Sequence, residues 1–446
     1  MTTKELISQI EKSPDLRVKV AITDIDGILR GKIIHKEKFL DALQTGSGFC
    51  DVVFGWDMND EAYDNVQVTG WHTGYPDAQY KLDVNTFRNI PWDEEVPLLL
   101  GDFSEINHPV CPRTLLKKIS GKALDAGFET KFSQEFEWFN FEETSESLSQ
   151  KDNQNPKPLT SGMFGYSVLR ASQQSNYFND LFTLLNDFNI PIEGLHTETG
   201  PGVYEAAIRY SDILEAADRA VLFKSGVKEI ASKHGIMASF MAKWNHDLPG
   251  CSGHIHQSLW KEGVNVFHDE NAEFGISDEM KSFMAGQLLL LPIILPMYAP
   301  TINSYKRLVE GAWAPTTLTW GLDNRTTALR VINPNANATR VELRVPGSDA
   351  NPYLAMSAAL ASGLYGIQNG LKLQSITKGN GYKDSSNGKL PSSLKEATQN
   401  MKESSLAREI LGSEFVDHYV ATREWECRQY ANQVTDWELK RYFEII

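Results

Sequence analysis

The sequence predicts an α+β fold with a small N-terminal part and a large C-terminal part. Residues 17–36 alternate apolar and polar side chains around an Asp-Gly turn, which is typical of a β-hairpin. Residues 211–235 carry regularly spaced apolar positions and close on a glycine, as an amphipathic helix does. Short strand-like segments lie on both sides of this helix, and a chain of 446 residues is long enough for more than one domain.

The pattern of residues 1–107 predicts a mostly β unit that begins with a short amphipathic helix. Alternation within residues 80–92 and 94–103 predicts further strands. Two prolines at residues 109 and 112 then precede a helical pattern. We therefore predict an N-terminal domain of residues 1–107 and a C-terminal domain of residues 108–446.

Composition excludes several classes of protein. A net charge of -15 argues against nucleic-acid binding, which needs a clustered basic surface. The four cysteines are far apart and the first residues lack the apolar core of a signal peptide, so we expect free thiols and a cytoplasmic location. The apolar run of residues 283–300 is interrupted by Pro292 and Pro296, which predicts a buried helix and no contact with a membrane.

Three strand-like segments each carry two polar side chains at positions i and i+2. Such positions point to the same face of a strand. A single pair of this kind is most simply explained by a strand face that is exposed to solvent. Three such pairs in one chain instead favour a shared functional site. The pairs are Glu135 with Glu137, His254 with His256, and Glu342 with Arg344.

A fourth segment adds Glu198 and Glu205, separated by a Gly-Pro-Gly turn. Taken alone, an ordinary surface turn explains it equally well. Clustered carboxylates repel one another, so an acidic site needs cations. Glutamates with one imidazole suit Mg²⁺ or Mn²⁺ better than zinc, and a pair of such ions is typical of phosphoryl transfer.

Five arginines lie between residues 307 and 344. The planar guanidinium group binds carboxylates and phosphates at two points, although solvated surface arginines are the plain alternative. The sequence has no phosphate-binding P-loop, so phosphates would be held by metals and arginines. These residues are Arg307, Arg325, Arg330, Arg340 and Arg344.

Together these segments resemble the glutamine synthetase family, and most closely its γ-glutamyl-amide-forming members. The resemblance follows the family's order over residues 110–446, and it is fainter in "DIDGILRGK" and "FGWDMND" of the N-terminal part. It rests on "FSQEFEWFNF", "HTETGPGVYEAAI", "SGHIHQSLW", "NSYKRLV", "LDNRTTALRV" and "RVELRVPGSDANPYLAMSAALASGL". It implies an N-terminal β-grasp domain, a catalytic domain on a curved antiparallel sheet, and a homo-oligomer of six-membered rings, usually doubled to a homododecamer.

The resemblance also implies a role for each matching residue. The first metal would be held by Glu137, Glu198 and Glu205, and the second by Glu135, His254 and Glu342. ATP would contact His256, Ser258, Arg330 and Arg340, and Arg325 would stabilise the transferring phosphoryl group. L-glutamate would be held by Gly250, Arg307 and Arg344.

The implied reaction has two steps. The side-chain carboxylate of glutamate takes the γ-phosphoryl group of ATP, and an amine then displaces phosphate from the acyl phosphate. The sequence departs from the family at the amine site. Trp313 stands where the family has a glutamate that helps take a proton from ammonium, and the family's N-terminal ammonium-binding acid has only Asp57 as a counterpart.

An indole in place of a carboxylate favours a larger, partly apolar amine, and its face attracts ammonium groups. We therefore expect an amide-forming ligase that uses a hydrophobic monoamine. Three alternatives stay open at this point: glutamine synthetase itself, a polyamine ligase that uses Asp60 and Glu61 for a second cation, and a non-catalytic scaffold. The simplest alternative for Trp313 is that its ring only packs against its own loop and has no part in amine binding.

Overall fold

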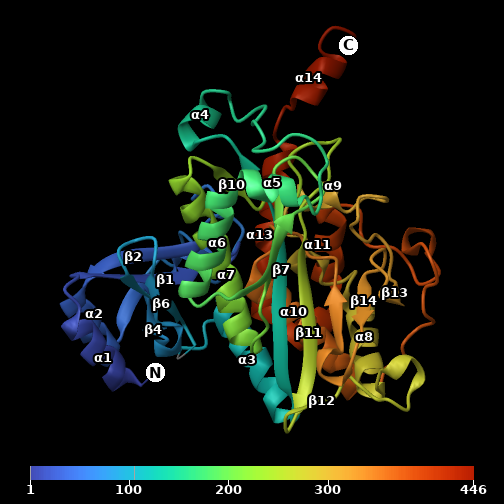
Figure 1. Ribbon diagram of the computed structural model, residues 1–446, viewed down its shortest axis with the longest axis horizontal. Helices are drawn as coiled ribbons and strands as arrows, with labels where there is room; N and C mark the ends of the chain where they lie inside the picture. The colour runs from blue at the N-terminus through green and yellow to red at the C-terminus, as the bar shows by residue number, and fades with distance from the viewer. Residues whose placement is uncertain (1, 105) are drawn as a thin grey trace.

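The computed structural model describes residues 2–104 and 106–446, which form two β-sheets with helices packed on them (Figure 1). The smaller sheet is built from strands of the N-terminal part, and the larger sheet from strands that begin at Glu129. The predicted α+β class is confirmed.

The N-terminal sheet has six strands, namely β1 Arg17–Thr23, β2 Leu29–His35, β3 Ser47–Cys50, β4 Asp77–Leu82, β5 Arg88–Ile90 and β6 Val96–Asp102. Helices α1 Thr3–Lys12 and α2 Lys36–Thr45 belong to the same part. The strands β1 and β2 are the predicted hairpin, and Gly27 at φ +85° supplies the left-handed residue of its turn. The strand order is β2-β1-β6-β4-β3 with β5 on β6, and β1 runs parallel to β6.

The larger sheet has nine strands in the order β13-β14-β15-β11-β7-β9-β8, with β10 on β7 and β12 on β11. Its strand pairs are antiparallel, as predicted, except β13 and β14 at one edge, which are parallel. The bounds are β7 Glu129–Phe141, β8 Ile192–Thr197, β9 Val203–Ile208, β10 Met237–Ser239, β11 Gly253–Lys261, β12 Val264–Asn265, β13 Trp320–Leu322, β14 Leu329–Ile332 and β15 Arg340–Leu343.

The long strand β7 separates a buried face from the face that carries the predicted site. Phe136 and Trp138 are fully buried and pack on Phe223, with ring centroids 5.6 Å away in both cases. Phe223 belongs to helix α7, which spans Ile213–Lys233. Glu135 and Glu137 point the other way because neighbouring side chains of a strand alternate. The period-2 pattern of the sequence is thus confirmed here.

The remaining helices lie around this sheet, except α14, which projects from the body of the chain (Figure 1). They are α3 Pro112–Asp125, α4 Ser145–Ser149, α5 Val168–Gln173, α6 Ser175–Asp187, α8 Asp278–Leu290, α9 Ser304–Arg307, α10 Pro352–Gln368, α11 Leu394–Glu403, α12 Ser405–Leu411, α13 Ser413–Ala431 and α14 Asp436–Tyr442. Short 3₁₀ helices span Asp51–Phe54, Val84–Thr86, Glu273–Gly275, Leu295–Met297, Ala336–Ala338 and Gly381–Lys383.

Most of the apolar run of residues 283–300 is buried, as predicted, although Leu289 is exposed. Helix α8 ends at Leu290, and Pro296 lies in the following 3₁₀ helix. Gly286 of α8 contacts α10 so closely that an added Cβ would lie 2.2 Å from the carbonyl oxygen of Ser362. In the described part of the chain, no helix combines the length and apolarity that crossing a membrane requires.

The N-terminal hairpin is fastened to the larger part of the chain. The side chain of Asn351, which caps α10, donates to the carbonyl oxygens of Asp24 and Ile25 at 3.1 and 3.2 Å. Arg423 of α13 pairs with Asp26 at 2.6 Å. Side chains from β1 and β6 share the large hydrophobic core with the C-terminal part, so the division at residue 107 stays a prediction.

Candidate active site

The register of the large sheet brings the predicted polar pairs together on one face. Glu135 of β7 pairs with His254 of β11, and Glu137 pairs with Glu205 of β9. On the other side of β11, His256 pairs with Glu342 of β15. Residues directly opposite in antiparallel strands point to the same face, so residues far apart in the chain form one acidic site.

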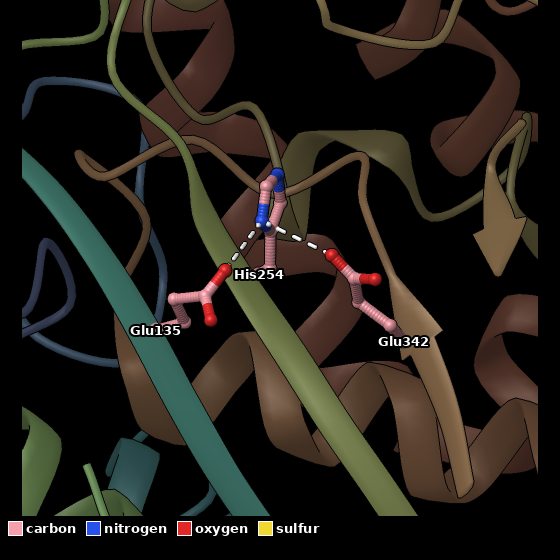
Figure 2. A group of neighbouring side chains, drawn as sticks. All are labelled: Glu135, His254 and Glu342. Atoms are coloured by element: carbon pink, nitrogen blue, oxygen red, sulfur yellow. Dashed lines mark hydrogen bonds and ion pairs between the residues drawn. The ribbon is translucent and has the colours of Figure 1, made fainter. Parts of the chain in front are cut away.

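One group consists of Glu135, His254 and Glu342, from three neighbouring strands (Figure 2). The Nδ1 atom of His254 lies 3.2 Å from Glu135 Oε1 and 3.3 Å from Glu342 Oε1. Burial, aided by the positive charge of Arg344, lowers the pKa of His254 to about 4, so its imidazole is neutral at pH 7. Its buried Nε2 atom has no hydrogen-bond partner among the described residues.

Both carboxylate oxygens of Glu342 are held by arginines. Arg330 donates to Oε2 at 2.9 Å, and Arg344 donates to Oε1. Burial opposes the ionised form of Glu342, but the positive charges of His254, which is protonated below its own pKa of about 4, and of Arg344 lower the pKa of Glu342 to about 2. Arg330 also pairs with Asp323 at 2.9 Å. The predicted phosphate-side Arg330 thus contacts a predicted metal ligand.

A second group is formed by Glu198 and Glu205 with His196, a residue that the sequence reasoning missed. His196 Nε2 lies 3.1 Å from Glu205 Oε1, and its Nδ1 lies 3.7 Å from Glu198 Oε2. Burial opposes the charged imidazole, but these carboxylates raise the pKa of His196 to about 9. The signal for this residue was present, because His196 and Glu198 repeat the i, i+2 spacing of the other pairs.

Glu137 borders this second group. Its Oε2 atom accepts a hydrogen bond of 2.7 Å from the backbone N–H of Ser252. Burial and the negative charge of Glu205 raise the pKa of Glu137 to about 8. The pKa of Glu205 is also raised, mainly by burial. Buried carboxylates with raised pKa values indicate a site short of positive charge.

The donor set fits divalent metal ions. The Nδ1 atom of the neutral His254 lies between Glu135 and Glu342 and is available as a ligand. The buried Oε2 of Glu198 has no hydrogen-bond partner among the described residues and only the ion pair with His196. The imidazolium of His196 supplies the one positive charge between two glutamates. Carboxylate oxygens with one imidazole are ligands for Mg²⁺ or Mn²⁺.

A cavity of about 410 Å³ opens beside Glu135. Three of the four predicted nucleotide contacts line it, namely His256, Ser258 and Arg340, and Arg330 is not among its lining residues. Arg340 donates to His256 Nδ1 at 3.3 Å, which fixes both side chains at the cavity wall. Trp260, which the sequence reasoning did not single out, adds an aromatic surface.

The predicted glutamate-binding residues meet at another point of the same face. The guanidinium of Arg307 is fully buried and donates to Ser252 Oγ at 2.8 Å and to the carbonyl oxygens of Val345 and Arg344. A Cβ added at Gly250 would lie 2.4 Å from the carbonyl oxygen of Ala242 and 2.9 Å from Arg307 Cγ, so only glycine fits. Arg325 is exposed, and its carbonyl oxygen accepts from Arg344.

The two residues predicted for the amine site differ in their surroundings. Trp313 is 58% exposed, so more than half of its surface is free of contacts within the described chain. Asp57 accepts hydrogen bonds from the backbone N–H groups of Asn59 and Glu61, and from the indole of Trp425 at 3.0 Å. Among the described residues, Asp57 makes no hydrogen bond or ion pair with the acidic groups above.

Comparison with known proteins places these residues in a family. The family model "Glutamine synthetase, catalytic domain" matches residues 109–442. "Type-1 glutamine synthetase 2" of Dictyostelium discoideum is 56% identical over all of this chain and 87% of its own length. "Glutamate–isopropylamine ligase" of Pseudomonas sp is 39% identical over 98% of this chain and 97% of its own.

"Gamma-glutamylethanolamide synthetase GlnA4" of Streptomyces coelicolor is 35% identical over 96% of this chain and 92% of its own. The solved structure described as "GmaS/ADP complex-Conformation 1" matches with a TM-score of 0.86 and 27% identity, covering 98% of this chain and 99% of that chain. The sequence resemblance is thereby confirmed. This chain belongs to the glutamine synthetase family.

Proposed function

We propose that this protein is an ATP-dependent ligase that joins the side-chain carboxyl group of L-glutamate to an organic amine. The observation that carries the proposal is the convergence of the two acidic groups beside a cavity lined by Glu135, His256 and Arg340. A phosphoryl donor in that cavity would reach the acidic groups directly. Two relatives are named a glutamate–isopropylamine ligase and a γ-glutamylethanolamide synthetase, which supports the same reaction class.

Two divalent ions, Mg²⁺ or Mn²⁺, would be held by the residues that the sequence singled out. Glu137, Glu198 and Glu205 would hold one ion, and Glu135, His254 and Glu342 the other. When bound, such ions supply positive charge that screens the glutamate carboxylate from the triphosphate. His196 then loses its role as the local cation, so metal binding would release its proton.

The chain's own residues would position the reactants. Arg307 and Arg344 would orient glutamate, whose side-chain oxygen attacks the γ-phosphorus while the bond to ADP breaks. Arg325, exposed at the rim, would donate N–H groups to the phosphoryl oxygens as charge develops on them. The neutral amine nitrogen then attacks the acyl carbon, the carbon–oxygen bond to phosphate breaks, and the nitrogen releases a proton.

Glutamine synthesis from ammonia is the second candidate, because one relative at 56% identity is named a glutamine synthetase. The exposed Trp313 favours an organic amine, since an indole supplies contact surface and no negative charge. A polyamine is less well supported, because Asp60, one of the two acids expected for its second cation, already pairs with Arg30 at 2.7 Å.

Phosphate release with ATP, glutamate and Mg²⁺ tests the proposal across ammonia, alkylamines, arylalkylamines and polyamines. We expect faster turnover with an apolar monoamine than with ammonia. Equal or faster turnover with ammonia would establish glutamine synthetase activity instead. No phosphate release with any amine would identify a non-catalytic scaffold. Glu137→Gln, which keeps the side-chain shape, should abolish turnover while leaving the assembly intact.

We also propose that the protein forms a double ring of six subunits each. The C-terminal helix α14 projects from the body of the chain (Figure 1). Large apolar side chains of this helix and of the residues after it are exposed, among them Trp437, Leu439, Phe443, Ile445 and Ile446. Such a surface is typical of a protein–protein interface and supports an oligomer.

A further inference from the structure

A second cavity, mainly apolar, lies beside the proposed site and is not lined by any of the predicted site residues. It has a volume of about 710 Å³ and lies between residues 241–246 and residues 303–309. Met241, Trp244 and Val309 form its apolar side. A volume of this size is in the range that binds small organic molecules.

Strand β7 connects this cavity to the acidic groups. Phe139 and Phe141 follow Glu137 at alternate positions and therefore continue the same face. The ring of Trp244 packs edge-on against both, with centroids 5.3 Å from Phe141 and 6.4 Å from Phe139. Trp244 of the cavity wall thus packs on the same face of β7 that carries Glu135 and Glu137.

The other end of this row faces the nucleotide cavity. Lys131, Ser133 and Glu135 line the 410 Å³ cavity that contains His256 and Arg340. Along one face of β7 the order is therefore nucleotide cavity, acidic groups and apolar cavity. A substrate that approaches the acidic groups from the side opposite ATP would pass the apolar cavity.

The chain also links the apolar cavity to the glutamate-binding residues. Lys306 and Val309 line the cavity and flank Arg307 in sequence, while Ala242 lies between the lining residues Met241 and Lys243. The carbonyl oxygen of Ala242 accepts the backbone N–H of Cys251 at 2.8 Å, next to Gly250. The cavity and the proposed glutamate site therefore share two walls.

The charge around the cavity selects among amines. Its titratable lining residues are Lys243, His246 and Lys306, and none of the described lining residues is acidic. Neither lysine forms an ion pair with a described carboxylate, although Lys306 lies over the ring of Tyr430 at 5.6 Å. A ligand tail with its own ammonium group would be repelled, whereas a hydrocarbon tail would not.

We propose that this cavity binds the hydrocarbon part of the amine substrate and excludes amines that carry a second positive charge. The inference rests on the proposed ligase function and specifies the substrate class of that reaction. The reacting nitrogen would lie toward the acidic groups, and the tail would lie against Met241, Trp244 and Val309.

Three four-carbon amines that differ only at the far end test the proposal: butylamine, 1,4-diaminobutane and 4-aminobutanoate. For the wild type we expect kcat/KM to be at least tenfold higher for butylamine than for 1,4-diaminobutane. The double variant Lys243→Glu with Lys306→Glu should reduce this ratio at least tenfold, with KM values for ATP and glutamate unchanged. Lys372→Glu, which makes the same kind of charge change at a different cavity, is the matched control and should leave the ratio as in the wild type.

A steric variant keeps the proposal open to refutation if the double variant does not fold. Val309 is exposed, so Val309→Trp should be tolerated and should fill the cavity. We expect turnover with butylamine to fall more than tenfold while turnover with ammonia is retained. The proposal is overturned if neither variant changes the amine profile, or if 4-aminobutanoate is the best of the three amines. Absence of phosphate release with every amine would instead overturn the proposed function.

Discussion

Trp313 holds a backbone conformation that is uncommon for a large residue. Its φ is +58°, and its ring is exposed. A non-glycine residue in the left-handed region costs about 1 kcal/mol. Glycine would avoid this cost, and Gly311 two positions earlier does adopt such a φ, at +84°. An exposed tryptophan that bears this cost is expected to have a function.

Trp313→Glu should shift amine preference toward ammonia, because a carboxylate restores negative charge where ammonium would bind. We expect the ratio of kcat/KM for ammonia to that for butylamine to rise at least tenfold. Trp313→Phe, which keeps an aromatic surface, serves as the control and should change the ratio little. An unchanged ratio in Trp313→Glu would show that the ring has no part in amine choice.

Glu137 gives the metal-free protein a definite pH dependence. Its pKa of about 8 in the folded protein is above the usual 4.5, so the folded state keeps a proton that the unfolded state loses. Stability is therefore lost as pH rises from about 4.5 to about 8. Glu137→Gln removes this titration.

We expect the variant in EDTA to melt a few degrees higher than the wild type at pH 8, with a smaller difference at pH 5.5. Thermal unfolding followed by circular dichroism at the two pH values measures both differences. An equal gain at both pH values would show that the titration of Glu137 is not responsible.

At the scale of elements, helix α13 holds the segment that carries Asp57. Tyr63 packs edge-on against Trp425 with centroids 5.8 Å apart, and Asn65 donates to the carbonyl oxygen of Ala421 at 2.8 Å. The indole N–H of Trp425 donates to Asp57 itself. The position of the predicted amine-site acid therefore depends on a helix near the C-terminus.

Trp425→Phe should raise the KM for the amine several-fold without changing the KM for ATP. The ring contact with Tyr63 can persist, while the hydrogen bond to Asp57 is lost, at a cost of about 1 kcal/mol in stability. Steady-state kinetics with each substrate varied in turn measures the effect. Equal changes in both KM values would indicate a general loss of structure and contradict a specific role of Trp425.

The sequence predicted which way the side chains of a single strand point better than it predicted which strands pair with each other. Period-2 spacing correctly placed Glu135 and Glu137 on one face, because alternation is a local property of a strand. In the sheet, Glu137 lies opposite Glu205, and His256 lies opposite Glu342. These pairings join segments that are far apart in the chain. The family resemblance implied them, whereas the local sequence pattern did not. The parallel pairing of β13 with β14 was missed for the same reason.

Polar partners were the least predictable part of the site. His196 was overlooked because a lone histidine before two acids has no local signature beyond its spacing. Arg330 and Arg344 both donate hydrogen bonds to Glu342. This arrangement depends on the pairing of β14 with β15, and each of these strands is only four residues long. The apolar cavity lies between two segments far apart in the chain, so the motif of residues 303–309 marked one of its walls but not the cavity itself.

At the scale of the whole molecule, α14 offers a test of assembly. We expect the intact protein to have a mass of twelve times the 50.1 kDa chain in mass photometry or sedimentation. Removal of residues 433–446 should give smaller species, because the exposed apolar side chains of α14 are lost. An unchanged mass would contradict a role of this helix in assembly.

The order of sites along β7 bears on how this enzyme would change over evolution or in the laboratory. Lys131, Ser133 and Glu135 line the cavity that we propose for the nucleotide, whereas Phe139 and Phe141 border the space that we propose for the second substrate. Substitutions beyond Glu137 would thus alter which nucleophile is accepted without disturbing phosphate activation. One ancestral catalyst could diversify into many amide-forming activities through changes confined to one end of a single strand.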